Sequence, residues 1–321
     1  MSSILDGATQ RRPFAGEGGR TGAKFEAAVL RDGTPVIVKH VRPDDWLVLV
    51  TGGVSHLYNV WNSGLLERVP RQIDHAMIAM EQQDDGWLLV MRDVSDAVLA
   101  EGRVLSRQEN RRVLTAIDAL HAAFIGDDVG GVALQTHYEA LTPRKTAELT
   151  HLDTPIPELC RRGWELFGDV APRDVADALH ALLDDTAPLS DELLKYPQTL
   201  IHGDCRLHNM GLTDEQLVLL DWEILGSGPG VVDTAWYLII SASRIDASRE
   251  QVIADYREIA GDRFDQRAWD LACIGAMVWL GWNKAIDIVE NPDPQIRAQE
   301  RADLDWWVSR LRAAFEAWSP V

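Results

Sequence analysis

The sequence predicts an α+β fold with two lobes, a small β-rich one followed by a large and mainly helical one. Two β-prone runs flank Arg31-Asp32-Gly33, and Asp-Gly between such runs is a strong hairpin signal. From Ser106 onward, apolar residues recur instead at helical spacing. A chain of 321 residues has ample length for both lobes. We place the boundary after residue 92, so that the lobes comprise residues 1–92 and 93–321.

The first lobe begins with a glycine-dense loop that contains Gly18 and Gly19. Glycine lets backbone N–H groups approach a phosphate closely, so this loop is a candidate nucleotide cover, although its spacing fits a plain mobile turn equally well. Lys39 follows in a predicted strand over residues 36–41 and interrupts an otherwise apolar run. Such a lysine either reaches solvent at a sheet edge or serves a buried anion, and the motifs further along the chain favour the second role.

Three further elements complete the first lobe. Residues 52–66 are predicted to form one helix behind the sheet. Residues 73–80 and 87–91 are predicted to form two more strands, joined by an Asp-Asp-Gly turn. Met91 and Asp93 then lie at the link between the lobes.

The second lobe opens with a capping box at Ser106-Arg107-Gln108-Glu109, which starts a helix that continues to Phe124. His121 lies within the apolar repeat of this helix, and we interpret it as a core histidine rather than a ligand. Further helices are predicted near residues 158–167 and 174–183.

The C-terminal part, residues 250–318, is predicted to be helical and is rich in tryptophan. Its longest apolar stretch, residues 271–282, is too short to span a membrane and is interpreted as a core helix. The tryptophans could form an aromatic cage for a quaternary amine, but tryptophans at helical spacing more often belong to the core.

The stretch from residue 202 to 209 reads His-Gly-Asp-Cys-Arg-Leu-His-Asn and is the most informative part of the chain. It follows a short apolar run, and a second apolar run over residues 216–220 leads directly into Asp221. Asp204, Asn209 and Asp221 are thereby expected to meet at one place. Magnesium prefers hard oxygen ligands and usually takes one or two from the protein, with phosphate and water supplying the others. Asp and Asn also cap turns, but the order and spacing of the whole set favour a site.

This order and spacing resemble the aminoglycoside phosphotransferase and choline kinase-like superfamily, whose members are small-molecule kinases with the protein-kinase-like fold. Protein kinases usually carry His-Arg-Asp where this chain has His202-Gly203-Asp204, and Asp-Phe-Gly where it has Asp221-Trp222-Glu223. The resemblance covers nearly the whole chain in motif order and is strongest between residues 202 and 236. It implies a bilobal fold whose first lobe binds the nucleotide and whose second lobe carries the catalytic groups and the acceptor.

The resemblance implies transfer of the γ-phosphate of ATP to a hydroxyl of a small molecule, such as an aminoglycoside-like compound, an amino alcohol or a sugar. Asp204 would orient the hydroxyl and accept its proton. Asn209 and Asp221 would hold magnesium and so the nucleotide. Lys39 would steady the phosphates, which the loop with Gly18 and Gly19 would cover.

The resemblance also implies several supporting residues. The hinge backbone at Met91 and Asp93 would contact the adenine. Asp233 opens a helix after a Gly- and Pro-containing loop and would brace the catalytic loop by hydrogen bonds, although a first-turn acid that complements the helix dipole explains its position too. His202 and Glu223 would support the site, Glu223 through a water-mediated contact to the metal or the acceptor. Polar residues between the helices, His137 among them, could line an acceptor pocket, with a solvated helix face as the default.

One feature departs from the family pattern. Kinase-like proteins place a glutamate on the helix behind the sheet to pair with the strand lysine, but residues 52–66 contain no carboxylate. The partner of Lys39 therefore stays open between Glu67 at the far end of that segment, another group, and the nucleotide itself. A nucleotide-binding pseudokinase with a regulatory role is the main alternative, and a protein kinase is disfavoured by Gly203.

The composition limits the partners further. Lys plus Arg number 31 and Asp plus Glu 50, which gives a net charge of −19. Such a surface repels nucleic acid and anionic membranes and weakly favours a cationic acceptor, although solubility alone explains the acidity as well. The three cysteines lie far apart, which argues against a disulfide framework or a zinc site, and no signal peptide pattern begins the sequence. We therefore expect a cytoplasmic protein with ATP and magnesium as its cofactors and a small-molecule acceptor as its partner.

Overall fold

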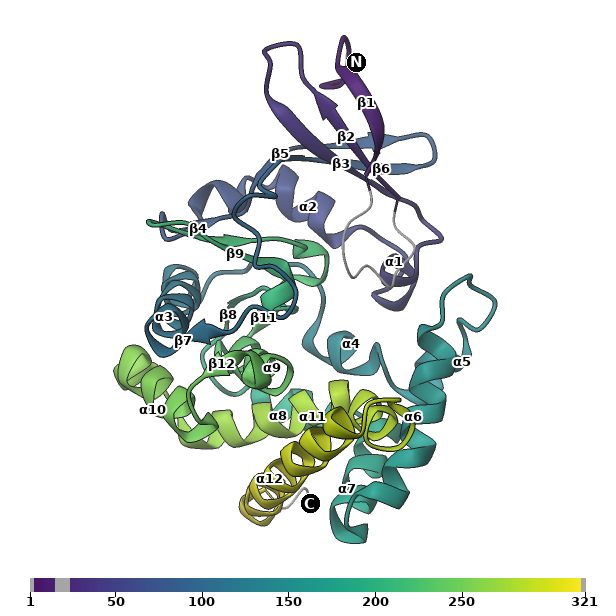
Figure 1. Ribbon diagram of the computed structural model, residues 1–321, viewed down its shortest axis with the longest axis vertical. Coiled ribbons are helices and arrows are strands. Elements are labelled where there is room, and N and C mark those ends of the chain that lie inside the picture. Colours follow the sequence, from purple (N-terminus) through teal and green to yellow (C-terminus); the bar gives the residue numbers. More distant parts are fainter. Residues whose placement is uncertain (1–2, 15–23, 319–321) are drawn as a thin grey trace.

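The computed structural model describes residues 3–14 and 24–318 and has the predicted α+β class, with a β-rich part above a helical part (Figure 1). Gly18 and Gly19 lie outside the described residues. The strands of the first sheet, in spatial order, are β1 (Thr9–Phe14), β2 (Lys24–Val29), β3 (Pro35–Val41), β6 (Gly86–Arg92) and β5 (Met77–Gln83).

All neighbouring strands in this sheet are antiparallel. The predicted hairpin at Asp32-Gly33 is confirmed, and Gly33 has a φ of +90°, a conformation that glycine adopts at little cost. Strand β1 was not predicted, because five of its six residues are exposed and its sequence lacks the alternation of a half-buried strand.

The prediction of one helix over residues 52–66 is wrong. A separate short helix, α1 (Trp46–Val50), ends before this segment. The segment itself contains α2 (His56–Asn62) and the start of the 3₁₀ turn η1 (Leu65–Arg68). Gly52 and Gly53 have φ values of +112° and +77°, and Gly64 has +73°, so the backbone leaves the helical region twice. Helix α2 begins after the N-capping residue Ser55, whose hydroxyl accepts the backbone N–H of Tyr58.

The strand predicted over residues 73–80 is divided in two. Ala76 has a φ of +56° and separates β4 (Ile73–Asp74) from β5. Strand β4 does not join the first sheet. It pairs in parallel with β10 (Leu217–Leu219), which itself pairs with β9 (Met210–Leu212), so a strand from the first 92 residues lies in a sheet with the second half of the chain.

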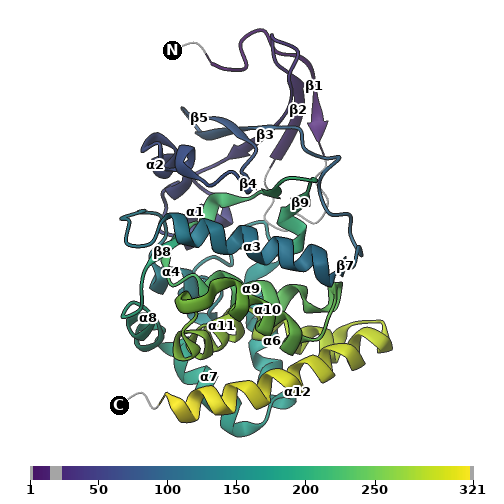
Figure 2. The same ribbon diagram turned by 90° about the vertical axis from the view of Figure 1, so that its left-hand side faces the viewer.

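The rest of the chain is mainly helical, as predicted, and its long helices stack below the sheet (Figures 1 and 2). The helices are α3 (Arg107–Ala123), α4 (Leu134–Glu139), α5 (Pro143–Ala147), α6 (Ile156–Val170), α7 (Arg173–Asp184), α8 (Ala187–Leu193), α9 (Val231–Ser241), α10 (Arg249–Ala260), α11 (Gln266–Glu290) and α12 (Pro294–Ala317). The short strands between them are β7 (Leu105–Ser106), β8 (Thr199–Ile201), β11 (Gly226–Gly228) and β12 (Ile245–Asp246). The capping box at Ser106 and Glu109 is present as predicted.

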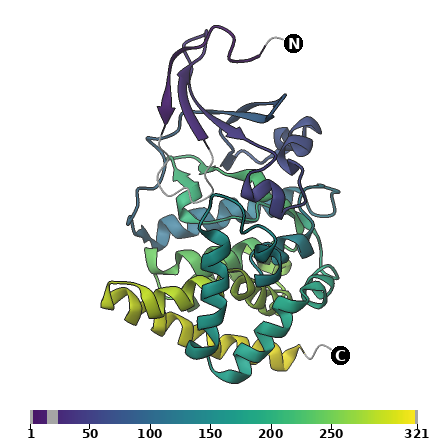
Figure 3. The same ribbon diagram turned by 90° about the vertical axis from the view of Figure 1, so that its right-hand side faces the viewer.

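Helix α11 is the centre of the helical part and packs against α6, α9 and α12. It is the one helix among the described residues that is long and apolar enough to cross a membrane, and 78% of its apolar window is buried inside the fold. Gly163 on α6 lies so close to α11 that a Cβ there would be 2.2 Å from the carbonyl oxygen of Trp282. Figure 3 shows the helices beneath the sheet from the side opposite to that of Figure 2. Five of the six tryptophans in residues 250–318 are buried, as the core interpretation predicts, at positions 269, 279, 282, 307 and 318. Trp306 is only half-buried.

Candidate active site

Asp204 lies on the loop that follows β8, and three side chains approach its carboxylate. Oδ1 accepts the indole N–H of Trp236 at 2.9 Å. Oδ2 accepts the side-chain amide of Asn209 at 2.8 Å, and the Nε of Arg206 lies 3.0 Å from the same oxygen. The carboxylate is thus held in one orientation, with 14% of the side chain exposed.

The backbone of the same loop is held by Asp233, which is fully buried in the first turn of α9. Its Oδ2 accepts the N–H of His202 at 2.7 Å, and its Oδ1 accepts the N–H of Gly203 at 2.8 Å. The ring of His121 lies 3.0 Å from Oδ2. Burial alone would raise the pKa of Asp233, but the hydrogen bonds from His121 and the loop hold that pKa below its usual range. The predicted hydrogen bonds from Asp233 to the loop are therefore present.

The backbone conformation and the tight surroundings of Gly203 explain why the motif has glycine at this position. Its φ is +85°, and an added Cβ would lie 2.5 Å from the carbonyl oxygen of Ile224. The preceding His202 is buried, and burial lowers the pKa of its ring. Its Nε2 lies 2.9 Å from the carbonyl of Leu220, and its Nδ1 accepts the N–H of Asp204 at 3.2 Å. A neutral ring that donates from Nε2 satisfies both contacts and ties the loop of residues 202–209 to the end of β10.

Asp221 follows β10 and has an unusual backbone conformation, with φ +65° and ψ +58°. A left-handed backbone conformation is uncommon for residues other than glycine and persists only where the surrounding structure imposes it. Residues with this conformation are frequent at functional sites. The N–H of the preceding Leu220 donates to the backbone oxygen of Asn209 at 2.8 Å. The two metal ligands that the sequence predicts, Asn209 and Asp221, are therefore connected by a backbone hydrogen bond from the residue before Asp221 to Asn209.

Lys39 is 7% exposed and bonds to two carboxylates from the second lobe. Its Nζ lies 2.9 Å from Oδ1 of Asp221 and also pairs with Glu223. Glu67, by contrast, is exposed on η1. The partners of Lys39, which the sequence left open, are thus Asp221 and Glu223. They lie 182 and 184 residues further along the chain and take the place of the glutamate that is missing from the helix.

The titration of this cluster follows from burial and charge together. Burial acts to lower the pKa of Lys39, but the two carboxylates outweigh it and raise that pKa above its usual value. Burial likewise acts to raise the pKa of Asp221, and the lysine more than reverses this. Glu223 shares one lysine with a second carboxylate, and burial raises its pKa.

The donor set fits a magnesium ion that also binds nucleotide phosphates. The amide nitrogen of Asn209 is used on Asp204, which leaves its carbonyl oxygen for a metal, and Asp221 supplies a carboxylate with a third of its side chain exposed. Among the residues that the structure describes, no three His, Cys, Asp or Glu side chains are grouped to hold an ion by themselves. Two protein ligands, completed by phosphate and water, are the expected arrangement for magnesium.

The hinge residues occupy the expected place but are already hydrogen bonded. Met91 lies on β6, between Ile37 on β3 and Met77 on β5. The N–H of Asp93 donates to the carbonyl of Pro35 at 3.0 Å. An adenine at the hinge would therefore have to use other backbone groups than the Asp93 N–H.

A cavity of about 460 Å³ opens beside the catalytic loop, and both Asp204 and Asp221 line it. One wall is aromatic and is formed by the side chains of Trp46, Trp236, Trp279 and Trp282. His137 also lines the cavity, where its ring stacks on Trp279 with centroids 4.0 Å apart, and burial lowers its pKa to about 4. The sequence did not predict the contribution of Trp46, because its helix reaches the cavity only through the tertiary fold. It did not single out Trp236 either, although that residue follows the predicted site residue Asp233 by one helical turn.

The β-rich sheet over a helical part, with two acids, an amide and a buried lysine at their junction, defines a phosphotransferase of the kinase-like class. Residues 20–272 match the sequence profile of the phosphotransferase enzyme family (APH). The match covers most of the chain, and the protein belongs to that family: it is a small-molecule phosphotransferase. No curated protein sequence matches the chain.

Solved structures confirm the fold at low sequence identity. Spectinomycin phosphotransferase APH(9)-Ia, in complex with ADP and spectinomycin, has a TM-score of 0.55 and 12% identity over 97% of this chain and 96% of its own. Choline kinase LicA from Streptococcus pneumoniae has a TM-score of 0.56 and 13% identity over 95% and 96%. Aminoglycoside phosphotransferase APH(3'')-Id from Streptomyces rimosus, in complex with ADP and streptomycin, has a TM-score of 0.52 and 14% identity over 82% and 94%.

Replacing Asp233 with asparagine should destabilise the protein by about 3 kcal/mol, because an amide would face two buried N–H donors and an unpaired His121. The urea midpoint of unfolding measures the loss, with Asp214→Asn in an exposed turn as the matched control. Because the pKa of Asp233 is lowered in the folded state, its contribution is present above the unfolded pKa, near 4, and is lost as pH falls through the folded value. The gap between parent and variant should therefore narrow below about pH 4, and equal midpoints at neutral pH would contradict the bracing role.

Proposed function

We propose that the protein transfers the γ-phosphate of ATP, with magnesium, to a hydroxyl of a small amine-bearing molecule. One observation supports this most strongly: the candidate base Asp204 and the candidate metal carboxylate Asp221 line the same cavity, whose aromatic wall could hold an acceptor. In this proposal residues 1–92 bind the nucleotide, and residues 93–321 supply the catalytic groups and the acceptor site.

The residues of the site would divide the reaction between them. Asp204 would orient the acceptor hydroxyl and take its proton as the oxygen attacks the γ-phosphorus and the bond to ADP breaks. Asn209 and Asp221 would hold magnesium, which neutralises phosphate charge when it is bound. The ion pairs with Asp221 and Glu223 hold the ammonium group of Lys39 at the boundary of the lobes. When nucleotide binds, Lys39 would exchange these bonds for bonds to the phosphates.

The charge of the cavity supports an acceptor that carries an amine. Six carboxylates line it, against three Lys and Arg side chains. Lys284 pairs with Glu300 at 3.0 Å and also with Asp303, so its charge is already matched within the wall. Asp287, one of the lining carboxylates, accepts hydrogen bonds from the amides of Asn283 and Asn291, and within residues 3–14 and 24–318 no cation pairs with it. A cationic group beside the aromatic wall would therefore gain from both charge and cation–π contact.

The test is ADP release with ATP and magnesium across a panel of aminoglycosides, macrolides, choline-like amines, amino sugars and amino alcohols. We expect one amine-bearing class to respond. Asp204→Ala serves as the blank, and mass spectrometry of the responding acceptor should show one added phosphate. Neutral sugars are included as the uncharged comparison, and a response only from them would contradict the charge argument while leaving phosphotransfer intact.

The alternative is a nucleotide-binding pseudokinase, which the absent helix glutamate favours. Glu223 and Asp221 weaken that argument, because they give Lys39 carboxylate partners within the described residues. ATP binding without ADP release in the presence of any acceptor in the panel would support the alternative over the proposed function.

A further inference from the structure

We propose that Trp236 is a positioning residue, whose indole N–H fixes the carboxylate of Asp204 so that Oδ1 faces the acceptor hydroxyl. This inference rests on the proposed function and adds to it a residue that the motif does not contain. It is carried by the hydrogen bond from the indole to Oδ1, at 2.9 Å, and by the burial of Trp236, which is 6% exposed.

The contacts of Asp204 divide unequally between its two oxygens. Oδ2 receives the amide of Asn209 and lies against the guanidinium of Arg206. Among the described residues, Oδ1 receives a single donor, the indole of Trp236. A carboxylate oxygen has two lone pairs, so Oδ1 keeps one for a further hydrogen bond. Since Asp204 and Trp236 both line the cavity, this lone pair is the candidate acceptor of the hydroxyl proton.

The position of Trp236 on α9 explains how the contact arises. Asp233 and Trp236 are three residues apart on this helix and therefore lie on the same face. Asp233 holds the backbone of the catalytic loop at His202 and Gly203, while Trp236 holds its carboxylate. One turn of a buried helix thus fixes both the path of the loop and the orientation of its acid.

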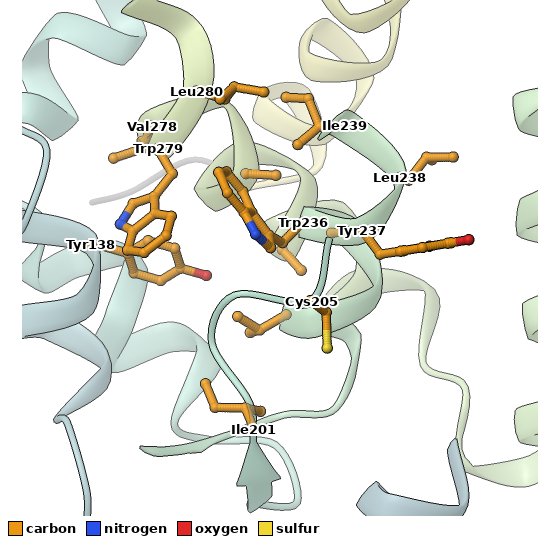
Figure 4. Packing of buried hydrophobic residues seen from close by; sticks show 14 of the residues in the cluster. Tyr138, Ile201, Cys205, Trp236, Tyr237, Leu238, Ile239, Val278, Trp279 and Leu280 are labelled. Atoms are coloured by element: carbon orange, nitrogen blue, oxygen red, sulfur yellow. The ribbon is translucent and has the colours of Figure 1, made fainter. Parts of the chain in front are cut away.

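The indole ring is itself prevented from turning. Trp236 and Trp279 meet edge to face, with centroids 4.9 Å apart and an interplanar angle of 89° (Figure 4). Trp279 in turn stacks on His137 and donates its indole N–H to the backbone carbonyl of the same residue. The three rings form a column from α4 through α11 to α9, and this column ends at Asp204.

The column also forms part of the cavity wall, since all three of its rings line the cavity. An acceptor that packs on this wall therefore contacts the ring that orients the base. Binding and orientation of the hydroxyl are thereby expected to depend on the same surface.

The test is the Trp236→Phe variant, which keeps an aromatic ring and removes the N–H donor. We expect kcat to fall roughly 10- to 100-fold, because a base that is free to rotate loses its alignment with the hydroxyl. KM for ATP should stay within about twofold, because in the described part of the chain the indole N–H of Trp236 bonds to Asp204 and not to Lys39, Asn209 or Asp221. Trp307→Phe, the same change in a fully buried position outside the cavity, is the matched control and should keep the parental kcat.

A double-mutant cycle separates positioning from general damage to the fold. In an Asp204→Asn background, adding Trp236→Phe should cost much less than tenfold in residual kcat, because the base that it orients is already absent. Equal fold losses in both backgrounds would show a merely structural role. The thermal midpoint of each variant, measured with and without ATP, checks that the fold is retained.

The contact itself can be observed without an acceptor. In protein labelled with ¹⁵N-tryptophan, the indole cross-peak of Trp236 is identified by its loss in Trp236→Phe. It should shift in Asp204→Ala, whereas the peak of Trp307 should not. An unshifted Trp236 peak, or parental kcat in Trp236→Phe, would overturn this inference alone. A parent protein that phosphorylates no acceptor would overturn the proposed function and this inference with it.

Discussion

Replacing Asp204 with alanine is expected to remove turnover while leaving ATP binding nearly intact. The carboxylate contacts Trp236, Asn209 and Arg206, and none of these three contacts involves the lysine that would bind the phosphates. General base catalysis contributes about 10²- to 10⁴-fold to a rate, and we expect kcat to fall within or beyond that range. The measurement is ADP release at saturating ATP, alongside the dissociation constant for ATP by calorimetry.

The matched control is Asp214→Ala, which removes a carboxylate of the same length from an exposed turn between β9 and β10. It changes the net charge by the same amount and should keep the parental kcat. Comparable kcat in Asp204→Ala and the parent would contradict the assignment of Asp204 as the general base. Loss of ATP binding together with turnover would show that Asp204 instead helps to hold the nucleotide.

Replacing Asp221 with asparagine is expected to lower kcat on the order of 100- to 1,000-fold and to raise the magnesium concentration needed for half-maximal activity. Removing one preorganised electrostatic contact to a reacting group typically costs this much. Asparagine suits the test because it adopts a left-handed conformation more readily than most residues, so the φ of +65° should be retained. The change therefore removes the charge and leaves the backbone in place.

A magnesium titration distinguishes a metal ligand from a partner of Lys39. If Asp221 served only the lysine, its loss would weaken activity equally at every magnesium concentration. Partial recovery at high magnesium is the expected result, and Asp214→Asn, with the same chemical change in an exposed turn, should show the parental titration. An unchanged magnesium requirement in Asp221→Asn would contradict the ligand role.

The part of the site that the sequence predicted is the part encoded by local spacing. Asp204 and Asn209 are five residues apart on one loop, and Asp221 follows the apolar run that forms β10. Strand β10 pairs with β9 directly after the loop, so short-range connectivity brings the three residues together. Asp233 follows at the start of a helix, and its hydrogen bonds to the loop are present. The resemblance to a known family strengthened each of these expectations.

The contacts that the sequence did not predict join distant segments. The partners of Lys39 lie about 180 residues away, and no spacing rule connects them to β3. The pairing of β4 with β10 is likewise long-range, and an apolar run cannot indicate which sheet a short strand joins. The helix predicted over residues 52–66 failed for a local reason, because two glycines with positive φ at its start outweighed its apolar pattern. Trp236 could have been noticed, since it lies one turn from Asp233.

The pairing of β4 with β10 has a mechanical consequence for the enzyme cycle. Strand β4 precedes β5 and β6 of the upper sheet by only a few residues, while β10 runs within two residues into Asp221. The backbone of the first lobe is therefore paired with the second lobe at this edge, two residues before Asp221. We expect a motion of the upper lobe to displace Asp221 less than it displaces the strands at the far side of the sheet. Nucleotide exchange would then leave the candidate metal carboxylate in place.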